Sequence, residues 1–522
     1  MRSYMDDIVL AIDCGTQSLR ALLFDPSGRL IDFHKEEYPQ VYVSPKPGWA
    51  EQDLFIYQQA LTKSCFVLKQ RQPEKWQHVK AIAVTTQRDT CVLLDRDGKP
   101  LKPAILWLDQ RMADYDCKLP VHYKIGFKII GMDKAAFISA KKCKANWIRQ
   151  NEPELWKKTH KFLLLSGWFN YLLTGQFVDS VANQIGHVPF NYKKQRWANP
   201  RTDYQPYLFQ IDKEKLPELV QPATVIGKLT KDAQKLTGLS SEVYVIATGS
   251  DKGCETLAMG CLKESLACAS LGTTATLQIT SDRYLEPIKF MPSYPAVIPG
   301  HFNPEVEIFR GFWMVSWFKN EFGNYEAQLA AQKGVSVEEI FDDLLKNTKP
   351  GSLGLVLQPY WGAGLKMPEA RGAIIGFGDV HNRAYLYRSI IEGLSYALLD
   401  AAEKIERVSH RVIEKVAVTG GGSRSDFVCQ ILSDVLGREV LRGEIPEAAG
   451  LGAAICGFVG LKYYNDFGQA IDKMVRYSKS FKPNTDNSKL YRRLYREVYR
   501  RIYSHLSSLY KSLQQITGYP EY

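Results

Sequence analysis

The spacing of apolar and polar residues predicts that the chain opens with buried strands joined by tight turns. Residues 8–13 are apolar up to a terminal acid, a pattern typical of a buried strand. Gly15 permits a sharp reversal after this strand, because a residue without a Cβ adopts positive φ at little cost. Residues 19–33 predict two further strands separated by a turn. Thr16 and Gln17 are therefore expected at the tip of a hairpin.

The same pattern recurs about half the chain further on. Residues 266–280 predict a strand, a reversal at Gly272 and Thr273, and a second strand. Backbone N–H groups and hydroxyls at such a tip suit a phosphate, and Asp13 could hold Mg²⁺ through water. For one hairpin alone, an ordinary turn in which Asp13 and Thr16 satisfy the backbone is an equal alternative. Two copies, one in each half, favour two similar domains that face one nucleotide.

Polar side chains gather where the predicted strand 79–85 ends. Gln87, Arg88 and Asp89 follow it directly, so this strand end could grip a compact polar ligand. Further on, Trp107 stands beside charged and amide groups, a combination that holds polyhydroxy molecules against the ring face. The alternative, which this segment alone favours, is that Trp107 belongs to the core and that its neighbours form a surface salt bridge.

A Gly-flanked acidic loop near the middle of the chain follows another clear strand at residues 243–247. It contains Asp251 and is expected to open a helix, which would place a carboxylate at the foot of a cleft between the halves, as a base. Asp251 could instead only cap that helix, and the two interpretations compete evenly. The strand predicted at 415–419 ends in a turn that lets the backbone touch a flat ligand or a phosphate, with Gly420, Gly421, Gly422 and Ser425.

Several stretches show the helical spacing of apolar residues. Residues 137–175 are predicted to be mainly helical, and a long helix is predicted near 383–408. Small residues at 446–454 predict a helix start that is suited to close packing. Near the end of the chain, a stripe with a spacing of four lies beside Arg pairs and predicts an amphipathic helix with one basic side, through Leu494, Val498, Ile502 and Leu506.

The composition is that of an ordinary globular protein with two to four domains. Of 522 residues, 45% are hydrophobic and 24% are charged. No run of about 18 apolar residues predicts a membrane span, and the polar start is unlike a signal peptide. Ten cysteines occur without a C-x-x-C pair or zinc-ligand spacing, so we expect reduced thiols and a cytoplasmic protein.

The net charge of +11 allows two interpretations. Nucleic-acid binding through the C-terminal Arg pairs would require salt-dependent retention on DNA or RNA, and no known nucleic-acid module accompanies them. A solvated helix packed on the last domain explains the same residues, and positive charge also attracts anionic nucleotides. We therefore expect a small-molecule partner, no membrane association and no nucleic acid. The oligomeric state stays open, a homodimer included.

Seven segments, in the order that the family shows and from about residue 8 to about 460, together resemble the FGGY family of carbohydrate kinases. Each one alone is a weak signal. The segments are Asp13-Cys14-Gly15-Thr16, Gly48-Trp49-Ala50-Glu51-Gln52-Asp53, Trp107-Leu108-Asp109-Gln110-Arg111, Gly249-Ser250-Asp251, Gly272-Thr273-Thr274, residues 372–392 and Gly420-Gly421-Gly422-Ser423. The resemblance implies an α/β protein with two RNase H-like domains, the actin/hexokinase-like ATPase fold, around a central cleft.

The resemblance also implies the domain boundaries and the ligand that each domain binds. Residues 1–250 would form the domain on the sugar or polyol side, and residues 251–485 the domain on the ATP side. Residues 486–522 would form the basic helix packed on the second domain. ATP and Mg²⁺ are the implied phosphoryl donor and metal ion.

Carried over position by position, Asp251 corresponds to the catalytic base, and Asp13 corresponds to the acid near Mg²⁺, where Asp251 also lies. Arg88, Asp89 and Trp107 fall, with Asp251, where the family contacts its substrate. The ATP contacts that the resemblance implies are Gly15, Thr16, Gln17, Gly272, Thr273, Gly421, Gly422 and Ser425.

The acceptor is left open by departures from the family's patterns. The segment 87–90 resembles the Gln-Arg-Glu-Thr of glycerol kinases with a shorter acid, and Lys252 stands where they have Gln. A pentulose, a tetritol or a glycerol-like polyol therefore remain candidate acceptors. The alternative is a nucleotide-binding protein of the same fold that has lost catalysis and acts as a sensor or scaffold, against which the intact Asp13 and Asp251 speak.

Overall fold

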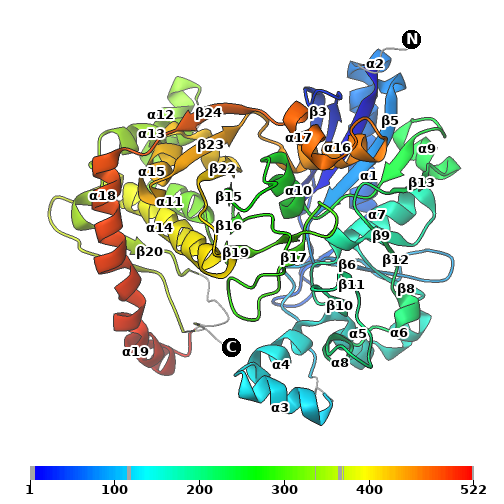
Figure 1. The fold of residues 1–522 in the computed structure, drawn as a ribbon, viewed down its shortest axis with the longest axis horizontal. Helices are drawn as coiled ribbons and strands as arrows, with labels where there is room; N and C mark the ends of the chain where they lie inside the picture. Colours follow the sequence, from blue (N-terminus) through cyan, green and yellow to red (C-terminus); the bar gives the residue numbers. More distant parts are fainter. Residues whose placement is uncertain (1–5, 115–118, 336, 362–366, 368, 520–522) are drawn as a thin grey trace.

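The computed structural model describes residues 6–114, 119–335, 337–361, 367 and 369–519. The protein consists of two α/β halves, each built on a six-stranded sheet (Figure 1). The first sheet contains, in spatial order, β13 (Val225–Lys228), β14 (Tyr244–Ile246), β5 (Val79–Thr86), β1 (Ile8–Cys14), β2 (Ser18–Phe24) and β3 (Leu30–Glu37). The second contains β19 (Glu305–Ile308), β16 (Ala275–Gln278), β15 (Leu266–Leu271), β22 (Lys415–Thr419), β23 (Glu439–Gly443) and β24 (Tyr477–Phe481).

The two sheets repeat one topology. β1 pairs antiparallel with β2, β2 pairs antiparallel with β3, and β5 lies parallel to β1 on its other side. β15, β16, β19 and β22 repeat these relations in the second sheet. The hairpins predicted around Gly15 and Gly272 are thus one element in two copies. This duplication confirms the predicted fold class, two RNase H-like domains of the actin-like ATPase fold.

Two helices lie between the sheets and join the halves into one core, α10 (Asp251–Ala258) and α16 (Ala448–Gly460). α16 packs on α10 and on the first sheet. Small residues allow this approach: a Cβ on Gly452 would lie 2.0 Å from the carbonyl oxygen of Cys254, and one on Gly457 would lie 2.6 Å from Cγ1 of Val9. The predicted close packing of this helix is confirmed, and it holds α10 beside both sheets.

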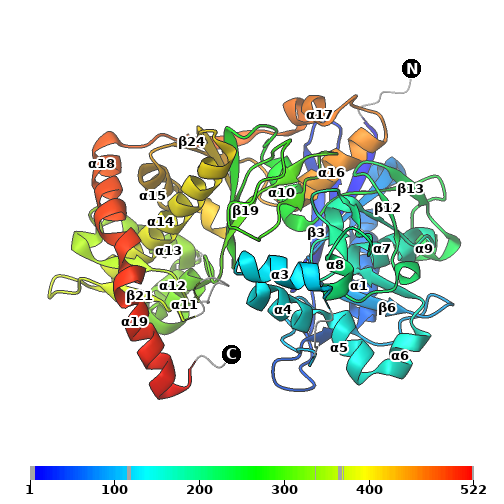
Figure 2. The ribbon, with the colours of Figure 1, turned by 60° about the horizontal axis from the view of Figure 1, so that its bottom comes forward.

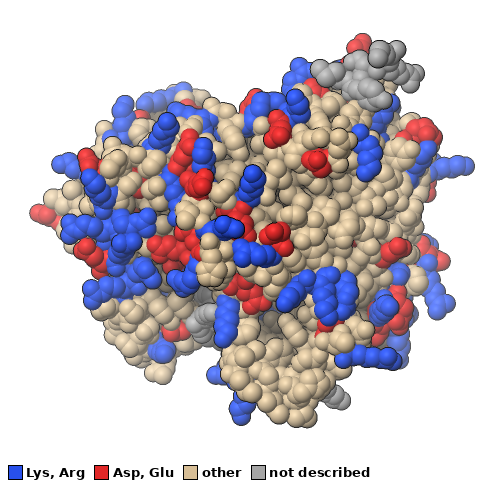
Figure 3. Space-filling model, in the orientation of Figure 1, with Lys and Arg blue, Asp and Glu red and all other residues tan. Residues whose placement is uncertain are grey.

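The C-terminal segment packs on the second half. α18 (Thr485–Leu494), a π-helical turn (Tyr495–Tyr499) and α19 (Arg500–Thr517) run along one side of the molecule (Figure 2). Tyr491, Tyr495 and Tyr499 are buried against Tyr396 of α14 (Arg383–Ser409), with ring centroids 5.2–6.3 Å apart. Of the predicted aliphatic stripe, Ile502 is buried and the other members are half-buried. Lys and Arg side chains gather over α18 on the exposed side (Figure 3).

The stretch 137–175 is mainly helical, as predicted, but it contains one short strand. Residues Lys161–Leu164 form strand β8, which pairs antiparallel with β6 (Cys91–Leu94). A distant strand satisfies the backbone of these residues, which their local apolar spacing cannot show. The rest of the stretch is helical, in α4 (Asp133–Lys142), α5 (Lys144–Asn151), α6 (Pro153–Lys158) and α7 (Leu165–Thr174).

The other elements cover the outer faces or form small ribbons. The helices are α1 (Leu54–Arg71), α2 (Pro73–Gln77), α3 (Val121–Ile129), α8 (Gln205–Leu208), α9 (Lys231–Thr237), α11 (Trp313–Phe322), α12 (Asn324–Lys333), α13 (Val337–Lys346), α15 (Asp426–Leu436) and α17 (Phe467–Met474). The short strands are β4 (Glu51–Gln52), β7 (Ala104–Ile105), β9 (Val178–Ser180), β10 (Phe190–Asn191), β11 (Arg196–Trp197), β12 (Glu218–Val220), β17 (Tyr294–Pro295), β18 (Phe302–Asn303), β20 (Val356–Gln358) and β21 (Ala373–Ile375).

Two general expectations can be compared with the structure. Cys117 lies outside the described residues, and the cysteines within them are all free and buried. None of the helices in the described part of the chain combines the length and the apolarity that crossing a membrane requires.

Candidate active site

Asp251 is the first residue of α10, at the junction of the two halves. The residue before it caps the helix: Oγ of Ser250 accepts a hydrogen bond from the backbone N–H of Gly253 at 3.3 Å. Asp251 is therefore not the cap, which removes the alternative interpretation of this residue. Its carboxylate is 29% exposed, and Oδ1 accepts a hydrogen bond from the backbone N–H of Lys252 at 2.8 Å.

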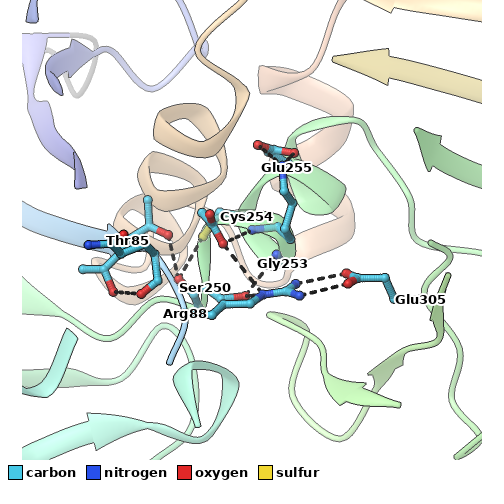
Figure 4. Close-up of polar contacts among 12 residues, drawn as sticks. Thr85, Arg88, Ser250, Gly253, Cys254, Glu255 and Glu305 are labelled. Carbon is cyan, nitrogen blue, oxygen red and sulfur yellow. Dashed lines mark hydrogen bonds and ion pairs between the residues drawn. The ribbon is translucent and has the colours of Figure 1, made fainter. Parts of the chain in front are cut away.

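Arg88, just beyond the end of β5, crosses to the other half (Figure 4). Its terminal nitrogens donate to the two carboxylate oxygens of Glu305 on β19 at 3.0 and 3.1 Å, and its Nε lies 3.7 Å from Oδ1 of Asp251. Burial alone would lower the pKa of Arg88, but Glu305 and Asp251 outweigh it, so the guanidinium stays charged. The predicted substrate residue Arg88 is thus a bridge between the halves beside the candidate base.

Three carboxyls face one another around the start of α10. Asp13 ends β1, and Arg20, directly opposite on β2, donates to it at 3.0 Å. Burial raises the pKa of Asp13 to about 6; Arg20 opposes this rise, and the charges of Asp251 and Glu255 add to it. Burial also raises the pKa of Asp251, against the opposing fields of Lys252 and Arg88. An added cation would therefore be favoured here.

Lys252 connects this cluster with the second hairpin. Its Nζ contacts both carboxylate oxygens of Glu255 at 3.0 Å and donates to Oγ of Ser270 at 2.8 Å. Ser270 lies two residues before Gly272, as Asp13 lies two residues before Gly15 in the first hairpin. Equivalent positions of the two hairpins thus converge on the first turn of α10.

The tip of the first hairpin is linked to the candidate acceptor side. Nε1 of Trp107 donates to Oγ1 of Thr16 at 3.0 Å, and the Thr16 hydroxyl donates to Oε1 of Gln87 at 2.6 Å. Trp107 is 44% exposed, so it is not the core residue that the alternative interpretation required. The fold brings Thr16 and Trp107 close to the end of β5, where the central strands β1 and β5 of the first sheet both end. Gln17 is exposed at the same tip.

Asp89 is engaged by protein groups rather than open. Its carboxylate contacts Nζ of Lys144 and Nδ1 of His187, both at 2.8 Å, and accepts from the backbone N–H of His187 at 3.0 Å. Burial opposes ionisation, but Lys144 and His187 outweigh it and hold the pKa of Asp89 far below its usual range. Its φ of +51° also fixes the turn after Arg88. A substrate contact by Asp89 stays a prediction.

The second hairpin tip is supported by the segment after β19. The backbone N–H groups of Phe312 and Trp313 donate to the carbonyls of Gly272 and Thr273 at 3.0 and 3.3 Å. Gly420 lies against the same hairpin with a φ of +88°, and a Cβ there would be 2.9 Å from the carbonyl carbon of Leu271. The structure therefore brings two of the predicted ATP-binding segments together.

The remaining predicted nucleotide residues follow in the next turn. A Cβ on Gly421 would meet no atom within 4 Å, whereas one on Gly422 would lie 2.6 Å from Phe312. Ser425 caps α15 by accepting from the N–H of Val428 at 3.1 Å, and its hydroxyl donates to Asp342. The Ser425 hydroxyl is thus occupied within the protein, while the backbone at Gly421 is open to a ligand.

Four charged residues of the site were missed from the sequence: Arg20, Glu255, Glu305 and Glu307. Arg20 could have been found, because the short first hairpin places it opposite Asp13. Glu255 could also have been found, since it lies one helical turn after Asp251. Nothing local in the sequence indicates that Glu305 would meet Arg88, which lies 217 residues away.

The carboxylates around Asp13 fit Mg²⁺, which needs few protein ligands. Within the described residues, no group of three or more His, Cys, Asp or Glu side chains could hold a metal ion. Mg²⁺ is commonly held through one or two carboxylates and completes its shell with phosphate oxygens and water. Asp13 and Asp251 supply carboxylate oxygens beside the two hairpins. Burial raises the pKa of both, so a bound cation would offset the cost of their ionisation.

The duplicated sheets, the paired hairpins and the acid at the start of α10 place the protein in the actin-like ATPase class. Residues 8–258 match the family model of the N-terminal domain of the FGGY family of carbohydrate kinases, and residues 267–461 match that of the C-terminal domain. The chain belongs to the FGGY family of carbohydrate kinases. It is therefore a carbohydrate kinase, with ATP as phosphoryl donor and Mg²⁺ as metal ion.

Relatives and solved structures of similar length span several acceptors. The chain is 27% identical over 492 residues to a xylulose kinase of Lactococcus lactis subsp. lactis (strain IL1403), covering 93% of this chain and 94% of the relative. It is 28% identical over 505 residues to a glycerol kinase of Thermococcus gammatolerans, with 93% and 96% covered. The structure of a gluconate kinase from Lactobacillus acidophilus has the same fold, with a TM-score of 0.81, 21% identity, and 97% and 99% covered.

Proposed function

We propose that this kinase transfers the γ-phosphoryl group of ATP to a hydroxyl of a small sugar or polyol, a pentulose, a tetritol or a glycerol-like molecule, with Asp251 as the base. The observation that carries the proposal is the partly exposed carboxylate of Asp251 at the point where both hairpins converge. The relatives named for xylulose and glycerol support this range of acceptors.

Asp251 is suited to take the proton of the attacking hydroxyl. Burial raises its pKa, which makes the carboxylate a better proton acceptor, while Lys252 and Arg88 limit the rise. The acceptor oxygen then forms a bond to the γ-phosphorus, the bond from that phosphorus to the bridging oxygen breaks, and ADP leaves. The proton of the hydroxyl ends on the Asp251 carboxylate.

The two hairpins hold the triphosphate in this proposal. Backbone N–H groups of Thr16, Gln17, Gly272 and Thr273 would donate to phosphate oxygens, whereas the N–H of Gly15 already donates to the carbonyl of Ser18 at 3.1 Å. Arg20 and Lys252 lie at the roots of the hairpins, each paired with a carboxylate. Mg²⁺, held by Asp13 and Asp251, supplies further charge neutralisation when bound. The open backbone at Gly421 and the neighbouring Gly422 would take the adenosine.

The acceptor side is formed by the first half. The exposed face of Trp107 would hold the C–H groups of the acceptor, and Arg88 and Asp89 would border it from the end of β5. The terminal nitrogens of Arg88 donate to Glu305. Arg88 therefore shapes the acceptor side, and its ion pair with Glu305 helps to position Asp251. Closure of the two halves would exclude water and limit ATP hydrolysis.

The test combines an acceptor screen with one substitution. ADP release is measured with a panel of sugars and polyols, first with the wild-type protein and then with Asp251→Ala. We expect the variant to keep its fold by circular dichroism and to lose kcat by about 10²–10⁴-fold, the usual contribution of a positioned base. A variant that phosphorylates the true acceptor at nearly the wild-type rate would refute the role of Asp251.

Other expectations belong to this proposal as well. The division into a sugar-side domain, an ATP-side domain and a C-terminal helix, the cytoplasmic location and a homodimer remain predictions. The alternative, a catalytically inactive sensor or scaffold, has no support among the relatives, which are named as kinases. ADP release that depends on an acceptor would exclude it.

A further inference from the structure

The cations around Asp251 are already neutralised by the protein itself. Three ion pairs have a nitrogen–oxygen distance of 3.0 Å: Arg20 with Asp13, Arg88 with Glu305, and Lys252 with Glu255. Asp251 and Glu307 belong to the same electrostatic group, because Arg88 and Lys252 act on the pKa of both. Among the described charged groups of this cluster, five carboxyls therefore face three cations.

Glu307 stands on the cleft side of the second sheet. It lies directly opposite Thr276 on β16, which lies directly opposite Ser270 on β15, so the three side chains share one face of the sheet. Ser270 accepts from Lys252 at the start of α10, which identifies this face as the one toward the candidate base. Burial, and then Glu305, raise the pKa of Glu307 to about 7, while Arg88 and Lys252 oppose the rise.

The neighbour of Glu307 has an unused hydrogen-bonding group. Thr276 is 2% exposed, and within the described residues its buried Oγ1 has no hydrogen-bond partner. Buried hydroxyls are almost always paired, so the unpaired hydroxyl of Thr276 leaves this face of the sheet with an unused hydrogen-bonding group beside Glu307.

We propose that Glu307 is a specificity-determining residue that restricts the acceptor to sugars and polyols without a negative charge. A carboxylate on the acceptor, as in an aldonate, would enter a cluster whose cations are already paired and would meet the negative charges of Asp251 and Glu307, both of which are poorly solvated. An uncharged hydroxyl meets no such opposition. This inference rests on the proposed function and assigns a residue that enforces its uncharged substrate class.

The test compares matched acceptors of the same chain length. The kcat/KM for ADP release is measured with glycerol, a tetritol and a pentulose, and with aldonates of three to five carbons. We expect the wild-type protein to prefer each uncharged acceptor over its aldonate by at least 100-fold. Glu307→Gln keeps the size of the side chain and removes its charge, so we expect the preference to fall at least tenfold.

Two controls separate specificity from a structural effect. Glu414→Gln removes the same charge from an exposed residue before β22, at the opposite end of that strand from Gly420, and should leave the preference unchanged. Lowering the pH from 8 to 6 protonates Glu307, which has a pKa of about 7, and begins to protonate Asp13, which has a pKa of about 6, so the preference should shrink in the wild type and shrink less in Glu307→Gln. If Glu307 had only a structural role, the preference would depend on pH in the same way in the wild type and in Glu307→Gln.

Failure of this inference and failure of the proposed function give different results. Equal use of aldonates by the wild type, or an unchanged preference in Glu307→Gln, would overturn the role of Glu307 while leaving the kinase intact. If no acceptor supports ADP release, the proposed function fails. Calorimetric binding of the same acceptors with a non-hydrolysable ATP analogue then decides the inference, and aldonates that bind as tightly as uncharged sugars would overturn it.

Discussion

The guanidinium of Arg88 binds both carboxylate oxygens of Glu305, at 3.0 and 3.1 Å, across the junction of the two halves. The same guanidinium passes Asp251 at 3.7 Å and hydrogen-bonds Oγ of Ser250 at 3.3 Å. One buried ion pair thus sets the position of the second sheet relative to the candidate base. Such a pair is costly to break on one side, because the remaining charge is left buried and unpaired.

Glu305→Gln is expected to destabilise the protein and to impair catalysis together. It removes the closer counter-charge of Arg88 and leaves the guanidinium with Asp251 at 3.7 Å, which we expect to lower the free energy of unfolding by about 3 kcal/mol. Urea denaturation followed by tryptophan fluorescence measures this change. The exposed pair of Glu154 with Lys157 provides the control: Glu154→Gln should change stability by less than about 1 kcal/mol. Equal effects of the two variants would contradict the bridging role.

Asp13→Asn is expected to be less active and more stable than the wild-type protein. The pKa of Asp13 is about 6 in the folded protein against an ordinary 3.8, so the folded state binds more protons than the unfolded state between these values. Wild-type stability should therefore fall as the pH rises from about 4 to about 6. In metal-free protein at pH 7, we expect Asp13→Asn to be more stable by about 2 kcal/mol, with no such advantage at pH 4.

Mg²⁺ provides the matching control for Asp13. Added Mg²⁺ should raise the thermal midpoint of the wild-type protein at pH 7, since it binds the folded state, and should have little effect on Asp13→Asn. Phosphoryl transfer by the variant should fall at least tenfold. A variant that responds to Mg²⁺ as the wild type does would show that Asp13 does not hold the metal ion.

Tyr491→Phe is expected to weaken the second half without touching the active site. The Tyr491 hydroxyl donates to Glu392 at 2.7 Å and accepts from Arg388 at 2.8 Å, both on α14. Loss of buried hydrogen bonds to charged groups should lower the free energy of unfolding by about 2 kcal/mol, measured by urea denaturation. Tyr396→Phe is the matched control, because the buried Tyr396 hydroxyl has no partner among the described residues. We expect that substitution to be neutral.

The sequence by itself determined the repeated elements of this protein. Strands with buried faces and glycines at sharp turns leave a local pattern, so the hairpins at Gly15 and Gly272 and the turn at Gly420 were predicted where they lie. The positive φ expected of Gly15 is wrong, since among these three glycines it is found at Gly420. The position of Asp251 at the start of a helix was predicted for the same reason. These features depend on residues that are neighbours in the chain.

Only the tertiary structure decided what the polar residues do. The strand at Lys161–Leu164 depended on a partner far away in the chain. The pairing of Arg88 with Glu305, and the place of Glu307 in the same cluster of charges, depended on how the second sheet lies against α10. Such contacts follow from packing across hundreds of residues, and packing leaves no trace in local spacing.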